Sequence, residues 1–339
     1  MKDRGHRTFS NARRAWLGCI AAIVAAPGLA QRAGATPRRV VICLGPTNAP
    51  DPIGPVRKAY AKEFASHGLS DGREIEIAIL RPRGSEWEPM ADDLKRAMSL
   101  NPYVIMRPAD GDMAMERLLP IVGDTPLVIW GVFDGFEDSI EVLNKRGVNV
   151  TGVMHSMIEL VEKRFALLKE LRPGARRAAI VGKMRGPPTP RQKQIIQRET
   201  DSFASAARAA GMELVPMLLD FHASTATTVA ELRKARVDVA ECPWGSGPEF
   251  WDQLAANGIA ASGRSGGAAR EGALLAGWAV GAVPAAIRLA AKVLRGQRAS
   301  ELPVERLREF RHAINMRTAR KLGITVPPTV ILQMHEVFE

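Results

Sequence analysis

Aromatic residues, metal-binding motifs and long apolar runs are scarce in this chain of 339 residues. Aromatics make up 5% of it and tyrosine occurs twice, so each of the six tryptophans is informative. The six histidines and three cysteines show no metal-ligand spacing, and no phosphate-binding glycine loop occurs. These absences argue against a zinc site and against a nucleotide-binding motif. Hydrophobic residues reach 46% and charged residues 24%, which is typical of a packed globular protein.

The N-terminal segment predicts export. Four arginines precede an apolar run at 15–26, and small residues then offer cleavage after Ala30 or Ala35. This order is that of a secretory signal peptide over residues 1–35, which implies a periplasmic protein. The run is shorter than the roughly 20 residues of a membrane span, which argues against an anchor. Arg13-Arg14 leaves both the general and the twin-arginine export routes open.

Cysteine usage and charge limit the mature chain further. Cys19 lies inside the apolar run rather than after it, which argues against a lipoprotein. Cys43 and Cys242 each end an apolar strand far apart in sequence, so two buried free thiols are expected. Removing residues 1–35 takes away six basic residues and one acid and lowers the formal charge from +11 to +6. That excess could favour an anionic ligand, but it is not a nucleic-acid footprint.

Strand and helix patterns alternate twice along the chain. The first series predicts strands at 39–44, 75–80, 102–106 and 126–130, with helices at 56–67, 90–99 and 112–120. The second predicts helices at 158–171, 194–210 and 227–235, with strands at 177–182, 213–218 and 237–242. An Ala-rich helix at 284–294 and another at 316–322 follow. This rhythm predicts an α/β protein with two Rossmann-like lobes, each with a parallel sheet.

Two stretches of the sequence resemble one known family. Residues 314–329 read Ile-Asn-Met-Arg-Thr-Ala-Arg-Lys-Leu-Gly-Ile-Thr-Val-Pro-Pro-Thr, and His335-Glu336-Val337-Phe338-Glu339 closes the chain. Asn149-Val150-Thr151-Gly152, followed by the helix up to Pro173, is the second stretch. Both resemble the ABC-transporter substrate-binding family whose better-known members bind aromatic amino acids.

The resemblance implies a type I periplasmic binding protein with three crossovers, near 151–152, 272–273 and 300–303. Lobe 1 would comprise 36–151 plus 273–300, and lobe 2 would comprise 152–272 plus 301–339. Such a protein closes on a small molecule by hinge bending and presents it to an ABC permease in the inner membrane. The resemblance implies a monomer without cofactor, metal or enzymatic activity.

Ligands of such sheets bind beyond the carboxyl ends of the strands, so the loops there supply the candidate binding residues. These are Thr47, Asn48, Arg107, Pro108, Ala109, Asp110, Trp130, Phe133, Asp134, His155, Ser156, Met184, Arg185, Trp244, Gly245 and Trp278. Indoles would pack an apolar body while an arginine forks a carboxylate. Each residue also has a purely structural interpretation: Trp130 in the core, Asp134 as a helix cap, Arg185 in solvent.

The chain departs from the family at two loops, which bears on the ligand. The segment that usually carries an acid for a ligand amine reads 276–280 here, with Val280 at the acidic position, and 242–246 replaces the usual Pro-Asp-Pro loop. Arg107 and Arg185 supply cations from opposite lobes. An anionic, partly apolar ligand is therefore expected rather than a standard aromatic amino acid.

Two other functions remain open at the level of sequence. An exported ligand sensor would have the same fold. Gly263-Arg264-Ser265-Gly266-Gly267 matches the nucleophile-elbow pattern of serine hydrolases. No aspartate follows Asp252, so the triad acid would have to be a glutamate such as Glu271 or Glu301. A glycine-rich loop beside the second hinge explains the pattern better.

Overall fold

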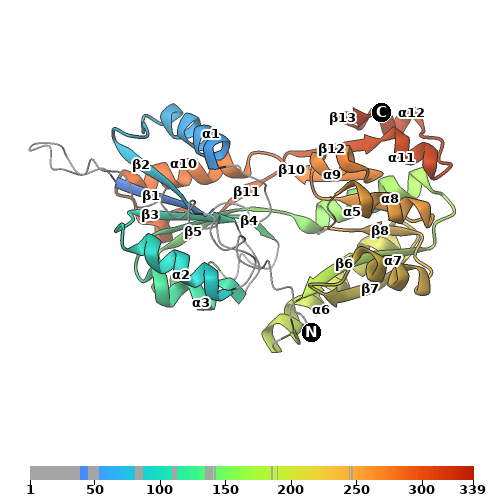
Figure 1. Cartoon of the computed structure of the whole chain (residues 1–339), viewed down its shortest axis with the longest axis horizontal. Coiled ribbons are helices and arrows are strands. Elements are labelled where there is room, and N and C mark those ends of the chain that lie inside the picture. The colour runs from blue at the N-terminus through green and yellow to red at the C-terminus, as the bar shows by residue number, and fades with distance from the viewer. Residues whose placement is uncertain are drawn as a thin grey trace, which may run out of the picture. The chain divides into compact units, whose positions relative to one another are not determined.

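Two sheets, A and B, each with helices on both faces, make up the part of the chain that can be described (Figure 1). A computed structural model of the chain describes residues 39–44, 53–80, 87–108, 113–133, 140, 143–184, 186–188, 190–243, 245 and 247–339. The signal segment predicted at 1–35 lies outside these residues.

Sheet A has the strand order β11-β5-β4-β3-β1-β2, and all its pairings are parallel. Its strands are β1 (Arg39–Leu44), β2 (Ile75–Leu80), β3 (Val104–Pro108), β4 (Leu127–Phe133), β5 (Val150–His155) and β11 (Glu305–Leu307). Its helices are α1 (Ile53–Ser66), α2 (Trp87–Met98), α3 (Met113–Val122) and α10 (Ala282–Leu294). Helices α1 and α10 cover one face, and α2 and α3 cover the other (Figure 1).

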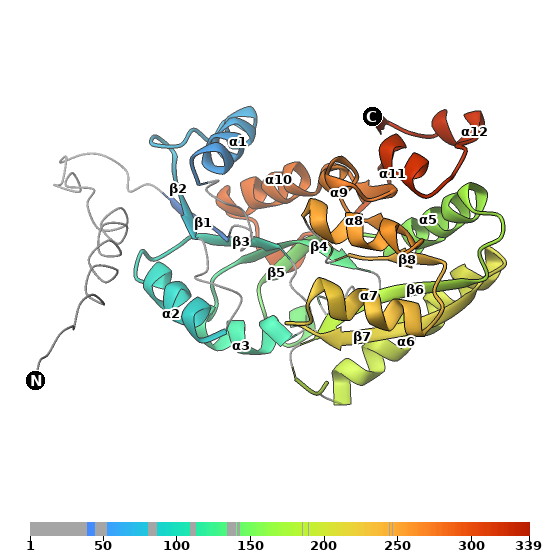
Figure 2. The same ribbon diagram turned by 45° about the vertical axis from the view of Figure 1, so that its right-hand side comes forward.

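Sheet B has the order β13-β12-β10-β9-β8-β6-β7, and only the β10–β12 pairing is antiparallel among those described. Its strands are β6 (Arg177–Met184), β7 (Glu213–Asp220), β8 (Val239–Glu241), β9 (Ala260–Gly263), β10 (Leu275–Ala279), β12 (Phe310–Asn315) and β13 (Glu336–Phe338). Its helices are α5 (Met157–Leu171), α6 (Pro190–Ala209), α7 (Thr225–Lys234), α8 (Pro248–Ala256), α9 (Gly266–Glu271), α11 (Met316–Lys321) and α12 (Pro328–Ile331). Figure 2 shows α6 and α7 on opposite faces of β6 and β7.

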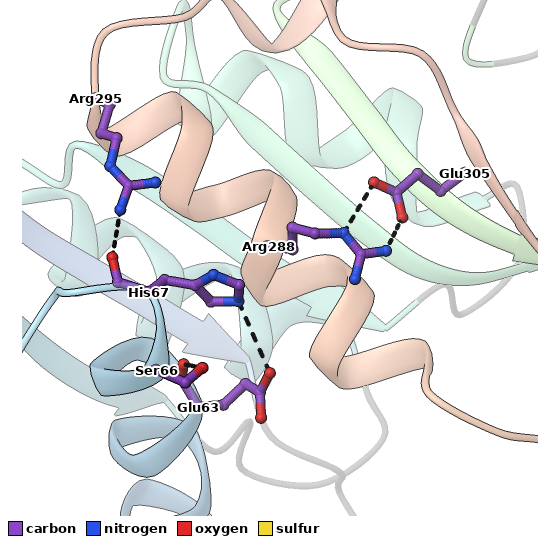
Figure 3. Close-up of polar contacts among 6 residues, drawn as sticks. All are labelled: Glu63, Ser66, His67, Arg288, Arg295 and Glu305. Atoms are coloured by element: carbon purple, nitrogen blue, oxygen red, sulfur yellow. Dashed lines mark hydrogen bonds and ion pairs between the residues drawn. The ribbon is translucent and has the colours of Figure 1, made fainter.

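Helix α10 returns to sheet A after five strands of sheet B, and both packing and polar contacts hold it there. Its small buried side chains, including Ala286 and Ala290, pack in the same core as Tyr60 and Phe64 of α1. Figure 3 shows the polar contacts: the Arg288 guanidinium pairs with both carboxylate oxygens of Glu305 in β11, and Arg295 donates to the backbone oxygen of His67. At the end of α1 the His67 imidazole lies 3.8 Å from the Glu63 carboxylate, and the Ser66 hydroxyl donates to the Glu63 backbone oxygen (Figure 3).

The chain crosses between the sheets three times, each time later than predicted from the sequence. All of β5 pairs in sheet A, so the first crossover is at Ser156 rather than 151–152. Strand β10 pairs in sheet B, so the second is at 280–281 and not at 272–273, and 273–279 do not belong with lobe 1. Strand β11 (Glu305–Leu307) pairs in sheet A, so the third is at 308–309 and not at 300–303.

Glycines that were expected to mark two of the crossovers have other roles. A Cβ on Gly152 would lie 2.6 Å from the backbone oxygen of Ile129, so glycine here allows β5 to pair closely with β4. Gly272 has φ 129° and ends α9, a conformation that few other residues adopt. Glycine at a position like these indicates close packing or a cap as readily as a hinge.

The two cysteines of the described chain are free and buried, as predicted. Cys43 belongs to the core between sheet A and α10, whereas Cys242 belongs to the core beneath α7 and α8. Burial raises the pKa of each thiol far above its ordinary value. Both are therefore protonated, unreactive core side chains.

Candidate functional site

Strand ends of sheet A bring together three of the predicted ligand residues. Arg107 and Pro108 end β3, and Pro108 is in register with Trp130 of β4. Arg107 is 3% exposed, and its Nε donates to the backbone oxygen of Pro108 at 3.0 Å. The Trp130 indole is 9% exposed and belongs to the core that contains α10. Trp130 thus has a structural role whether or not its edge also meets a ligand.

The first crossover carries two further predicted residues. His155 ends β5 and is in register with Phe133 of β4. The Ser156 hydroxyl accepts a hydrogen bond from the backbone N–H of Glu159 at 3.2 Å, which makes Ser156 the N-cap of α5. The hydroxyl fixes where the helix starts immediately after the chain leaves sheet A.

Met184 and Trp278 lie in strands of sheet B, and Gly245 lies between β8 and α8. Met184 is the last residue of β6. A Cβ on Gly245 would lie 2.5 Å or less from the rings of Phe250 and Trp251, so this glycine is required by packing. The Trp278 ring packs against α9, where a Cβ on Gly266 would lie 3.0 Å from it.

Part of the predicted set cannot be placed. Outside the described residues lie Thr47, Asn48, Ala109, Asp110, Asp134, Arg185 and Trp244, together with the side chain of Phe133. Their contact with a ligand remains a prediction, as it does for the residues above.

A buried polar cluster that sequence reasoning missed lies between α5 and the strands of sheet B. We call Arg164, Glu241, Ser262, Gly277 and His312 the Arg164 network. Arg164 of α5 is 0% exposed; its Nη1 donates to the backbone oxygen of Gly277 at 2.7 Å, and its Nη2 lies 2.8 Å from Glu241 Oε1. Ser262, in register with Glu241, donates its hydroxyl to the other carboxylate oxygen.

The network is completed by His312 of β12, which faces Gly277 across the antiparallel pair. A Cβ on Gly277 would lie 3.1 Å from the His312 ring and 3.3 Å from Arg164 Cδ, so these two side chains fill the space that glycine leaves. Nε2 of His312 is buried and has no hydrogen-bond partner among the described residues.

Two more ionisable groups adjoin the network. Burial lowers the pKa of Arg264, just after β9, to about 10, and the charge of Glu241 opposes that shift. Burial raises the pKa of Glu199 on α6, and the charge of Arg264 opposes that shift. Burial also lowers the pKa of Arg164, against the effect of Glu241. Glu241 thus serves as counter-charge for the buried Arg164 and the partly buried Arg264.

The network makes stability depend on pH. Burial, and then the charges of Arg164, Lys163 and His335, lower the pKa of His312 to about 4. In the unfolded chain the imidazole of His312 takes up a proton near pH 6.5, but in the folded chain it does not. The free energy of unfolding therefore decreases as the pH falls from 6.5 towards 4. We expect a loss of about 1–2 kcal/mol between pH 7 and 4.5, less than the full shift implies because water screens part of the interaction.

Urea unfolding of His312→Asn across this pH range checks the expectation. The variant should lose less stability on acidification than the parent protein, whereas His222→Asn, at an exposed position, should follow the parent. Parallel pH curves for His312→Asn and the parent would show that His312 is not the group responsible.

The nucleophile-elbow pattern has a structural explanation. The Ser265 hydroxyl accepts a hydrogen bond from the backbone N–H of Ala268 at 3.2 Å and caps α9. A Cβ on Gly263 would lie 2.5 Å from that of Ala268 and 3.2 Å from the ring of Trp251. The glycine makes room for Trp251, and the serine starts a helix.

The described residues contain no group of three or more His, Cys, Asp or Glu placed to hold a metal ion. None of their helices has both the length and the apolar character needed to cross a membrane.

The sequence contains a signal that could have identified Arg164 and Glu241 as buried charges. Arg164 lies four residues after Leu160 and four before Leu168, so it interrupts the apolar stripe of its helix. Glu241 interrupts the apolar run 239–242 in the same way. A charged residue at a core position of a regular element needs a buried partner.

Comparison with solved structures identifies the fold. The sequence matches no protein-family model and no curated protein. A Streptococcus pneumoniae ABC domain in complex with L-Trp superposes with TM-score 0.72 at 18% identity, covering 89% of this chain and 100% of that one. A periplasmic solute-binding protein of an ABC transporter from Actinobacillus succinogenes, with bound D-allose, gives 0.57 at 11%, covering 84% and 99%. A putative LacI transcriptional regulator from Bacteroides fragilis gives 0.52 at 11%, covering 81% and 96%.

One of these structures holds L-Trp, another holds D-allose, and the third is a putative transcriptional regulator. At such low identity the likeness establishes architecture. The chain has the type I periplasmic binding protein fold that ABC transporter solute-binding proteins use.

Proposed function

We propose that the chain is an exported, monomeric solute-binding protein that delivers a small, anionic and partly apolar molecule to an ABC permease in the inner membrane. The observation that carries the proposal is the chain path, with two sheets connected by three crossings. Ligands of open α/β sheets bind beyond the carboxyl ends of their strands. Two such edges joined by short crossings can close on one molecule by hinge bending. Export rests on the basic, apolar and small-residue order of 1–35.

The proposed ligand charge rests on the second crossover. Val280 occupies the position at which the resemblance implies an acid, and its backbone N–H donates to the backbone oxygen of Glu309 at 3.0 Å. The Glu309 carboxylate is 3.6 Å from the Arg311 guanidinium and so has its own counter-charge. A ligand ammonium at this point would need Asp110 or Asp134, which lie outside the described residues, as its partner, and without one its burial is costly. Arg107 and Arg185 are the cations proposed to meet a carboxylate.

A matched pair of probes tests this charge. Indole-3-propionate and L-tryptophan share the indole and the carboxylate and differ in the α-ammonium group. We expect indole-3-propionate, or another amine-free aromatic carboxylate of the same panel, to raise the melting temperature of the mature protein while L-tryptophan does not. A ligand at 100 times its dissociation constant stabilises by about 2.7 kcal/mol, which a thermal-shift assay resolves. Stabilisation by L-tryptophan alone would overturn the proposed charge.

A sensor role is the second candidate, and the likeness to a putative LacI regulator is the observation in its favour. The two roles differ in partner: an importer's protein docks on a permease, whereas a sensor docks on a signalling protein. Permease and ATPase genes beside this one would support the importer. Ser265 caps a helix, and hydrolysis is not proposed.

A further inference from the structure

One buried side chain lies close to the segments of sheet B next to all three crossovers. Arg164 lies two turns into α5, which starts directly after the first crossover at Ser156. It donates to Gly277, three residues before the second crossover at 280–281. Beside Gly277 it shares space with His312, three residues after the third crossover at 308–309: a Cβ on Gly277 would lie 3.3 Å from Arg164 Cδ and 3.1 Å from the His312 ring.

The second and third crossovers are also bonded to each other, through the backbone N–H of Val280 and the backbone oxygen of Glu309. These two segments form the antiparallel pair β10–β12, and the Arg164 network lies against the face of that pair that meets α5. A change in the angle at which these two segments leave sheet B is therefore expected to displace the groups beside Arg164.

Stability alone does not account for an arginine here. Taking two charges out of water is expensive, and replacing a buried ion pair by apolar side chains is often neutral or stabilising. Arg164 interrupts a helix stripe of leucine, valine and phenylalanine, where an apolar residue would pack without that cost. What the guanidinium adds is direction, because its planar fork donates to a carbonyl of β10 and at the same time lies 2.8 Å from a carboxylate oxygen of β8.

We propose that Arg164 is a positioning residue, which holds the sheet-B ends of the three crossovers in one arrangement and so confines the opening of the lobes to a narrow range. The inference rests on the proposed solute-binding function, since restricted opening is useful for capturing a ligand. The network does not touch the ligand in this proposal. It sets the fraction of ligand-free molecules whose lobes are in the conformation that binds ligand.

Spin-label distance measurements on the ligand-free mature protein test the proposal. Labels on Arg73→Cys and Lys234→Cys report from the two sheets, and both native side chains are 80% exposed. Cys43 and Cys242 are buried and should stay unlabelled. The test variant is Arg164→Met with Glu241→Gln, which removes both charges of the pair. The matched control is Arg172→Met, because Arg172 is the C-cap of the same helix α5 and donates to two backbone oxygens, those of Asp238 and Gly258, at the other end of the strands.

We expect the distance distribution of the double variant to be at least twice as wide as that of the parent, while Arg172→Met matches the parent. Loss of a merely structural contact would lower the melting temperature of both variants without widening either distribution. A folded double variant with the parent distribution overturns the proposal. Should the double variant not fold, Arg164→Lys decides in its place: it keeps the charge but loses the fork, so widening supports the proposal and an unchanged distribution overturns it. Because no ligand is used, failure here leaves the solute-binding role standing.

Discussion

Replacing Glu241 by alanine is expected to destabilise the protein by about 3–5 kcal/mol, because removal of one partner leaves a buried charge uncompensated. Arg164 loses the carboxylate 2.8 Å from its Nη2, and Arg264 loses the opposing charge that favours its protonated form. The Ser262 hydroxyl loses its acceptor as well. The substitution therefore removes a partner of two buried groups and of the partly buried Arg264.

Urea unfolding measures the effect, with Glu305→Ala as the matched control. Glu305 is likewise paired with an arginine, Arg288, through both carboxylate oxygens, but the side chains of Glu305 and Arg288 are 22% and 48% exposed. Ion pairs exposed to this degree contribute about 0–1 kcal/mol. Equal losses in the two variants would contradict the view that Glu241 carries a buried, shared charge.

Replacing Trp251 by alanine is expected to cost about 3–5 kcal/mol through lost burial and the cavity left behind. Trp251 is 1% exposed, and three glycines, Gly245, Gly263 and Gly272, make room for it. Phe250 packs edge-on against its ring at 4.9 Å between centroids. The indole nitrogen has no hydrogen-bond partner among the described residues, so the loss should come from packing.

Trp251→Phe separates size from aromatic character in the same unfolding measurement and should retain more of the stability. Trp278→Ala is the comparison at a partly exposed indole and should cost clearly less. A small effect of Trp251→Ala would mean that α8 and β9 move readily into the cavity left by the indole. That result would contradict the close packing of Gly245, Gly263 and Gly272 against Trp251.

Periodicity predicted most helices of this protein to within a few residues, because each buries an apolar stripe. Helix α5 was expected at 158–171 and spans Met157–Leu171, and α10 was expected at 284–294 and spans Ala282–Leu294. Helix α8 and strand β9 were not predicted. Strand β9 consists of Ala, Ala, Ser and Gly, whose small side chains carry little hydrophobic signal.

The positions of the crossovers and the Arg164 network could not be predicted from the sequence, for a different reason. A crossover is defined by which strands pair, and pairing depends on contacts between distant segments, such as β10 with β12. Arg164 and Glu241 each look anomalous in their own element, but only the packing of α5 on sheet B shows that they are partners. Ligand contact by the sixteen candidate residues remains a prediction.

The two buried thiols bear on the order of events during the proposed export. Once folded, Cys43 and Cys242 are enclosed in separate cores and protonated, so an oxidising compartment cannot join them. A chain that crosses the membrane unfolded presents both thiols to oxidants before either core exists. A disulfide formed at that moment would tie together strands from two different sheets and block both from closing. Such a chain must bury its thiols faster than they are oxidised, whereas a chain that folds in the cytoplasm and crosses intact avoids this competition.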